Sequence, residues 1–228
     1  MIVGDTGSIW RLLWWQKVHV LQFFVMGTVV TFAYEVLGWH WVVMPSLPLA
    51  IVGAALGIFV SFRTNSCYDR WWEGRKLWGR LINTSRHFTL QALAYVDDNH
   101  PQAGQQLVHR HIAYVHVLRC LLRNQVPVED SRVKARLTEE ELDLIRRHTN
   151  ATAALLDLQL RQVQRLQTSG AIDGLQLQSM DESIRHLLDI QGGCERIKKT
   201  PLPRIYGFIS GRMIMWFGML LPCGIVTD

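Results

Sequence analysis

Residues 36–62 read VLGWHWVVMPSLPLAIVGAALGIFVSF and contain no Asp, Glu, Lys or Arg. Residues 18–34, between Lys17 and Glu35, also lack these four residue types. A helix needs about 20 apolar residues to cross the hydrocarbon core of a bilayer. The two stretches therefore predict a first transmembrane helix at residues 18–37 and a second at residues 41–63.

The charged residues are concentrated after these stretches. Residues 63–203 hold 20 of the 24 Lys and Arg residues and 16 of the 19 Asp and Glu residues. We expect residues 64–203 to form a cytosolic domain, because basic segments beside membrane spans remain on the cytoplasmic side. The same rule places the N-terminus in the cytoplasm. A last apolar run at residues 205–226, interrupted by Arg212, predicts a third transmembrane helix.

Residues 1–17 combine aromatic and basic side chains. They include Trp10, Trp14 and Trp15 together with Arg11 and Lys17. Trp and basic residues anchor proteins at the boundary between membrane and water. We expect an interfacial N-terminal segment, and a multi-pass protein in the cell inner membrane or plasma membrane.

The segment between the second and third apolar runs has helical spacing. Thr138-x-x-Glu141 predicts a capping box, which opens a helix with apolar residues every three or four positions as far as Val163. Thr168-Ser169-Gly170 ends this helix, and Ser179-x-x-Glu182 predicts another that ends at Gly192-Gly193. No segment shows the alternation of a strand, so the predicted fold class is all-α.

Enzyme and metal-site motifs are absent from the sequence. It contains no phosphate-binding loop, nucleophile elbow or HExxH motif, and its four cysteines form no short pair. His109, His111 and His116 are expected on the surface, because positions i and i+2 lie on different faces of a helix. We predict no enzyme activity, cofactor or metal site. Nucleic acid is not an expected partner, because membrane orientation accounts for the basic residues.

The second apolar run carries two neighbouring stripes. Gly53, Gly57 and Ser61 repeat every four residues, and such small residues let helices approach closely in lipid. Ala54, Ile58 and Phe62 form an apolar ladder rotated from them by about 100°. Spacing alone favours a ladder that faces lipid or another helix over one that faces a pore.

Two motifs resemble the bacterial branch of the bestrophin family. The first is FRTNSCYDRWWEGRKLWG at residues 62–79, and the second is Gly192-Gly193-Cys194-Glu195-Arg196 followed by Thr200-Pro201-Leu202-Pro203. Their order and the flanking hydrophobic runs match the family. The resemblance implies a homopentameric ion channel, with four transmembrane helices and a cytosolic helical domain in each subunit. The fourth helix is absent from this sequence, as is the acidic segment that helps animal members to bind calcium, so no calcium site is expected.

The resemblance also implies site residues. The pore neck falls on Ala54, Ile58 and Phe62, and the cytosolic aperture falls at or near Leu175. The expected partners are other copies of the chain, membrane lipid and permeant monovalent ions. Chloride or another anion is the expected ion, and sodium is the alternative. The second alternative is a membrane-anchored adaptor or sensor without a pore.

Overall fold

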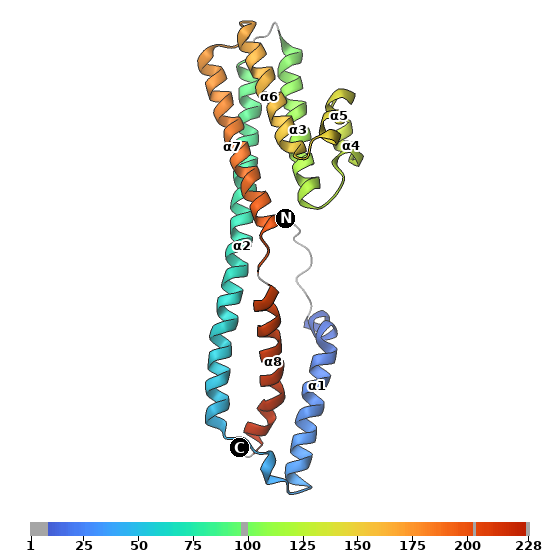
Figure 1. Cartoon of the computed structure of the whole chain (residues 1–228), viewed down its shortest axis with the longest axis vertical. Coiled ribbons are helices and arrows are strands. Elements are labelled where there is room, and N and C mark those ends of the chain that lie inside the picture. Colours follow the sequence, from blue (N-terminus) through green and yellow to red (C-terminus); the bar gives the residue numbers. More distant parts are fainter. Residues whose placement is uncertain (1–8, 97–99, 203, 227–228) are drawn as a thin grey trace. The chain divides into compact units, whose positions relative to one another are not determined.

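The computed structural model describes residues 9–96, 100–202 and 204–226 (Figure 1). These residues form helices joined by short connections, with no strand among them, so the predicted all-α class is confirmed. The chain divides into two compact units. A membrane unit comprises Met1–Tyr68 and Leu202–Asp228, and a polar unit comprises Asp69–Pro201. Of the expected interfacial segment, residues 1–8 lie outside the described residues.

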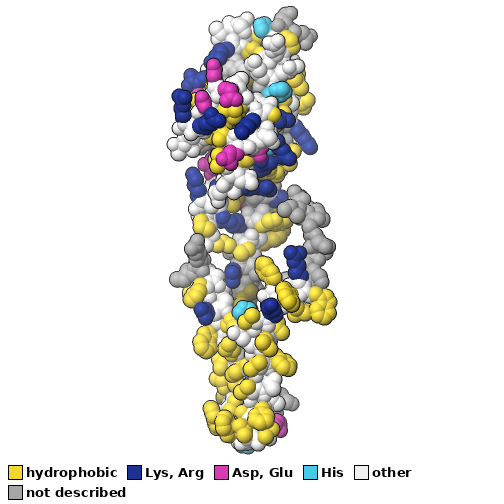
Figure 2. Space-filling view, turned by 90° about the vertical axis from the view of Figure 1, so that its right-hand side faces the viewer, with side chains coloured by type: hydrophobic (Ala, Val, Ile, Leu, Met, Phe, Trp, Pro, Cys, Tyr) yellow, Lys and Arg dark blue, Asp and Glu magenta, His cyan; other side chains and the backbone are white. Residues whose placement is uncertain are grey.

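The membrane unit contains α1 (Ile9–Glu35), α8 (Arg204–Ile225) and the first half of α2 (Ser46–Ala94). The described residues include three helical stretches long and apolar enough to cross a bilayer: Leu13–Glu35, His40–Ala94 and Gly207–Ile225. Many large hydrophobic side chains of this unit are exposed, and they gather on the face seen in Figure 2. Soluble domains seldom expose apolar surface on this scale, whereas lipid accommodates it.

Helix α8 packs between α1 and α2 in the membrane unit (Figure 1). A methyl group added to Gly218 would lie 2.6 Å from the ring of Phe23 on α1, and one added to Gly224 would lie 2.5 Å from Leu49 on α2. Small residues therefore allow α8 to approach both neighbours closely. The short turn η1 (His40–Val42) connects α1 to α2, and the Met44 amide after it donates to the Cys223 carbonyl at 2.9 Å.

The polar unit is a helix bundle formed by the second half of α2 with α3 (Pro101–Leu122), α6 (Ala151–Thr168) and α7 (Gly174–Lys199). The shorter elements η2 (Pro127–Glu129), α4 (Ser131–Lys134) and α5 (Glu139–Arg147) pack beside α3 and α6. The core of the bundle consists of fully buried apolar side chains, among them Phe88, Tyr114, Leu155 and Leu187. Lys, Arg, Asp and Glu side chains gather on its surface (Figure 2).

The capping box at Thr138 and Glu141 is confirmed, but the predicted extent of the following helix is wrong. Helix α5 ends at Arg147, because His148 has an extended backbone with ψ of 132°. Asn150 then caps a separate helix, α6, by accepting from the Ala153 amide at 3.1 Å. The predicted end at Thr168 is correct, and Gly170 follows it with a φ of +80°.

Helix α7 also differs from the prediction at both ends. It starts at Gly174, where Asp173 and Gln176 form a capping box, and not at Ser179. It continues through Gly192-Gly193 to Lys199. A methyl group on Gly193 would lie 2.8 Å from Leu77 of α2, so this glycine permits close packing and does not end the helix.

Candidate functional site

The apolar ladder lies on one face of α2 in the membrane unit. Ile58 is 60% exposed, Phe62 is 67% exposed, and Ala54 is also exposed. No charged side chain belongs to the ladder. Within a single chain, this face is therefore an uncovered apolar surface.

The opposite face of α2 packs against α8. Leu56 is only 5% exposed, and Gly53 and Leu49 lie against side chains or backbone of α8. At 100° per residue, Ala54 and Ile58 each point about 160° away from Leu56. The ladder consequently faces directly away from the helix that supports α2.

Arg63, which follows the ladder, points toward α8. Its Nη1 donates to the Ser210 hydroxyl at 2.8 Å, and Ser210 is fully buried. The nearest guanidinium nitrogen is 3.4 Å from the position of a methyl group added to Gly207. The charge next to Phe62 is therefore held on the α8 side of the helix, and the ladder itself remains uncharged.

The stripe of small residues divides between two environments. A methyl group on Gly53 would lie 2.8 Å from the Phe217 ring of the same chain, whereas one on Gly57 meets nothing within 4 Å. Ser61 is exposed, and its hydroxyl donates to the Gly57 carbonyl at 2.9 Å. Gly53 thus packs within the chain, while Gly57 and Ser61 remain on an open surface beside the ladder.

The start of α2 has a positive electrostatic character. The helix begins at Ser46 with no acidic residue in its first turn. Its first backbone N–H groups have no partner within the helix, and the aligned peptide dipoles place a partial positive charge at this end. An anion is favoured at such a position.

Leu175 lies in the first turn of α7 and is 77% exposed. It belongs to the polar unit, whereas the ladder belongs to the membrane unit. The predicted neck and the predicted aperture therefore both present exposed apolar side chains, but they belong to two different units.

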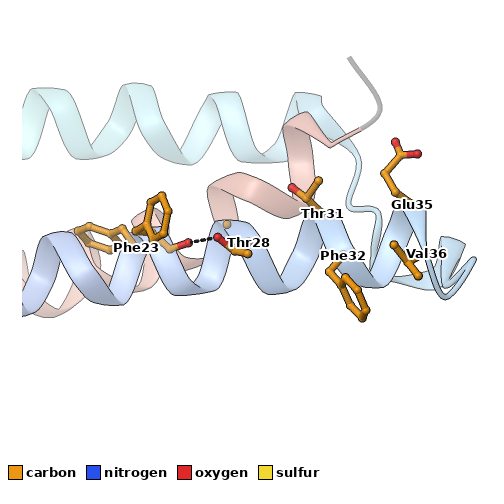
Figure 3. A pocket seen from close by; sticks show the side chains of 8 residues that line it. Phe23, Thr28, Thr31, Phe32, Glu35 and Val36 are labelled. Carbon is orange, nitrogen blue, oxygen red and sulfur yellow. Dashed lines mark hydrogen bonds between the residues drawn. The ribbon is translucent and has the colours of Figure 1, made fainter.

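A shallow hollow also lies along α1, lined by Phe23, Phe32, Glu35 and neighbouring residues (Figure 3). Thr28 in its wall donates its hydroxyl to the Phe24 carbonyl at 2.9 Å, so this polar group is already satisfied within the helix. The hollow is mainly apolar and widely open. Its chemistry suits a lipid chain or another helix better than a polar solute.

His111 was expected on the surface, and this expectation is wrong. It is 2% exposed, with its ring centroid 5.1 Å from that of Phe88 and 5.8 Å from that of Tyr114. Burial lowers the pKa of His111 to about 4, so its imidazole is neutral at physiological pH. The spacing of Leu107, His111, Tyr114 and Leu118 on one face of α3 was the signal that predicts its burial.

Metal ligands do not gather in the described part of the chain. No group of three His, Cys, Asp or Glu side chains suited to a metal ion occurs among residues 9–96, 100–202 and 204–226. Cys67 is exposed, and Cys120, Cys194 and Cys223 are buried as free thiols.

The two sequence motifs meet where α2 packs against α7. The Arg70 guanidinium donates to the carbonyls of Ile197 and Thr200, which lie at the end of α7. One helical turn further along α2, Glu73 forms an ion pair with Arg196. Leu77 lies against Gly193 one turn beyond that. The motif residues thus form a continuous contact between two helices, and none of these contacts involves the ladder.

Comparison with known proteins gives consistent results. A model of the bacterial and fungal bestrophin proteins matches residues 5–228. A voltage-dependent anion channel-forming protein of Ralstonia nicotianae is 34% identical over 83% of this chain and 63% of its own length. Its counterpart in Escherichia coli K12 is 31% identical over 79% of this chain and 58% of its own length. The chain thus spans about six-tenths of the length of these relatives.

Solved structures show the same similarity. The crystal structure of a bacterial bestrophin homologue from Klebsiella pneumoniae, carrying the substitution L177T, matches with a TM-score of 0.84 at 27% identity. The match covers 93% of this chain and 78% of that one. A second crystal structure, described as a membrane protein with the substitution G264A, matches with a TM-score of 0.86 at 26% identity.

Proposed function

The chain belongs to the bacterial and fungal bestrophin family, and from this premise we propose that it is a subunit of a homopentameric channel for small monovalent anions, chloride foremost. It is a membrane protein, and the family and the relatives named above point to a channel and not to an enzyme. The proposal assigns the pore neck to Ala54, Ile58 and Phe62 and the cytosolic aperture to Leu175.

The observation that carries the proposal is the uncharged ladder on the face of α2 that points away from α8. Five copies of α2 around one axis, each with this face inward, form three stacked apolar rings. Narrow apolar rings gate by dewetting, so a small change in their radius switches conduction. Because Arg63 is held toward α8, no charge enters the neck itself.

The preference for anions is supported by two features. Relatives about 30% identical are named as anion channel-forming proteins. In addition, the start of α2 carries a partial positive charge without a nearby acidic residue in its first turn. Sodium conduction and an adaptor without a pore are the alternatives that the flux experiment below tests.

The proposed arrangement in the membrane follows the basic residues. We assign residues 18–37, 41–63 and 205–226 to membrane spans, and residues 64–203 to the cytoplasm, because 20 of the 24 Lys and Arg residues lie in residues 63–203. The proposed membrane is the cell inner membrane or plasma membrane.

Flux through liposomes tests the function. The purified chain is reconstituted and given first a chloride gradient and then a sodium gradient, each with an impermeant counterion. Chloride flux above that of empty liposomes supports the anion channel, and flux of sodium alone overturns the anion assignment. No flux of either ion, with the protein inserted and folded, favours the adaptor.

Assembly is tested on the same preparation by native mass measurement in mild detergent. A mass of five subunits is expected. Gly57→Leu adds a large side chain where nothing lies within 4 Å in a single chain, so it should leave the subunit folded and reduce the pentamer. An unchanged pentamer would show that Gly57 does not face a neighbouring subunit.

A further inference from the structure

A groove of about 680 Å³ lies between α2 and α3 on the polar unit. Its walls are mainly apolar. They include Trp78, Ile82 and Arg86 from α2, and His111 and Val115 from α3. Trp78 and Ile82 are exposed although the polar unit is rich in charged side chains. Exposed aromatic and aliphatic residues beside an arginine are typical of protein interfaces.

The floor of this groove contains polar atoms that the described part of the chain does not satisfy. Both ring nitrogens of His111 and the Ser85 hydroxyl are buried without a hydrogen-bond partner. Native proteins pair nearly all such groups. The groove therefore has the character of a surface that another molecule completes.

A surface of complementary charge lies on α7. Its exposed residues include Leu188 with the acidic Asp181, Glu182 and Asp189. Arg185 pairs with Glu182 and Asp189, and Asp181 acts on it only as a more distant charge, without an ion pair among the described residues. This α7 face is net negative. The lining of the groove contains Arg86 and no acidic residue.

The two surfaces lie at the same height along the bundle. Helices α2 and α7 are antiparallel: Gln91 bonds to Ser179 at one end, and Leu77 lies against Gly193 at the other. Both helices rise about 1.5 Å per residue. Fourteen residues separate the two contacts on each helix, so positions between them can be matched one to one. Leu188 of α7 is then level with Ile82 of α2, and Asp181 of α7 lies about one turn from the level of Arg86 of α2.

We propose that the α7 face of one copy docks into the α2–α3 groove of the next copy in the ring. Leu188 enters the groove between Trp78 and Ile82, and Asp181 lies beside Arg86. The inference rests on the proposed pentamer and places the helices of each polar unit along its axis, so that cyclic symmetry keeps equal levels of neighbouring bundles side by side. A closed ring needs two different complementary surfaces on each subunit, and the groove and the α7 face are such a pair.

Disulfide cross-linking tests this contact. Ile82→Cys and Leu188→Cys are introduced together into the chain with Cys67→Ser, which removes the exposed native thiol. Oxidation should give a series of covalently linked species, from dimer to pentamer, on a non-reducing gel. Each single variant should remain monomeric, as should Ile82→Cys combined with Val126→Cys, which is exposed after α3. A product that stops at the dimer overturns the inference.

Charge reversal gives an independent measurement. Arg86→Glu should reduce the fraction of pentamer several-fold, Asp181→Arg in the same chain should restore it, and Arg165→Glu on the exposed surface of α6 should leave it unchanged. If the native mass is that of a pentamer but neither cross-linking nor charge rescue occurs, this contact is wrong and the proposed channel stands. If the unmodified chain is monomeric, the proposed assembly fails, and this contact fails with it.

Discussion

Ile58 stands at the middle of the apolar ladder, one turn from Ala54 and one from Phe62. Ile58→Ala removes three carbons from each subunit, so in the proposed pentamer the ring widens and dewetting weakens. We expect single-channel conductance to rise with little change in ion preference, because no charge is altered. Planar-bilayer recording of the reconstituted protein measures both quantities.

Val60 supplies the matched control for Ile58. It is half-buried and points about 200° away from Ile58 around α2, toward the α8 side. Val60→Ala should therefore lower stability and leave conductance near that of the wild type. If Val60→Ala raises conductance more than Ile58→Ala does, the pore is not lined by the face of α2 that carries Ile58.

His111 predicts a dependence of stability on pH. Its folded-state pKa of about 4 lies below the ordinary value of 6.5, so at pH values between them the unfolded chain binds a proton that the folded chain does not. Stability should fall as the pH drops below about 6.5, by about 2 kcal/mol between pH 7 and pH 5. Phe88 and Tyr114 lie against the ring, and Ser85, Arg86 and His116 line the same groove.

The measurement is the unfolding midpoint in detergent at pH 7 and pH 5. His111→Phe retains an aromatic ring beside Phe88 and should flatten the pH dependence. His109→Gln, at an exposed position on the same helix, should leave it unchanged. Equal slopes in the wild type and His111→Phe would assign the acid sensitivity to other groups.

At the scale of elements, the contact between α2 and α7 depends on the lack of a side chain at Gly193. Gly193→Val would place atoms against buried Leu77, whose side chain comes within 2.8 Å of the new Cβ. Overpacking of this kind costs about 1–3 kcal/mol. We expect a lower free energy of unfolding, measured by denaturant titration in detergent.

Gly192 is the control for this substitution, because it is the preceding residue in the same helix and nothing lies within 4 Å of an added Cβ. Gly192→Val changes helix propensity by the same amount as Gly193→Val. The difference between the two variants thus isolates the packing against Leu77. If both variants lose equal stability, helix propensity alone explains the effect.

At the scale of the whole molecule, the proposed topology predicts which positions react with an impermeant thiol reagent. Cys120 is buried and makes a poor reporter, so cysteines are introduced in a Cys67→Ser background. His40→Cys, in the short turn η1, should be labelled in intact cells. Gln164→Cys, exposed on α6, should be labelled only after the cells are opened. The reverse pattern would invert the topology.

The sequence by itself predicted the helical class and the location of the apolar runs. Charge-free stretches of this length and helical spacing are local properties, and the chain forms helices there. The capping box at Thr138 was predicted for the same reason, because its partner lies three residues away. The break at His148 was missed, since an apolar spacing that continues through it does not show that the backbone turns.

Only the tertiary structure decided which face of each helix is covered. The ladder and the α8-facing stripe of α2 are both apolar, and nothing in their spacing tells them apart. Helix α8 packs on Leu49 and Gly53 and leaves Ile58 and Phe62 uncovered. The spacing on α3 places His111 on an apolar face, but the groove around it formed because α3 packs against α2. Periodicity gives the direction of a side chain around its own helix, but burial depends on the neighbour that packs there.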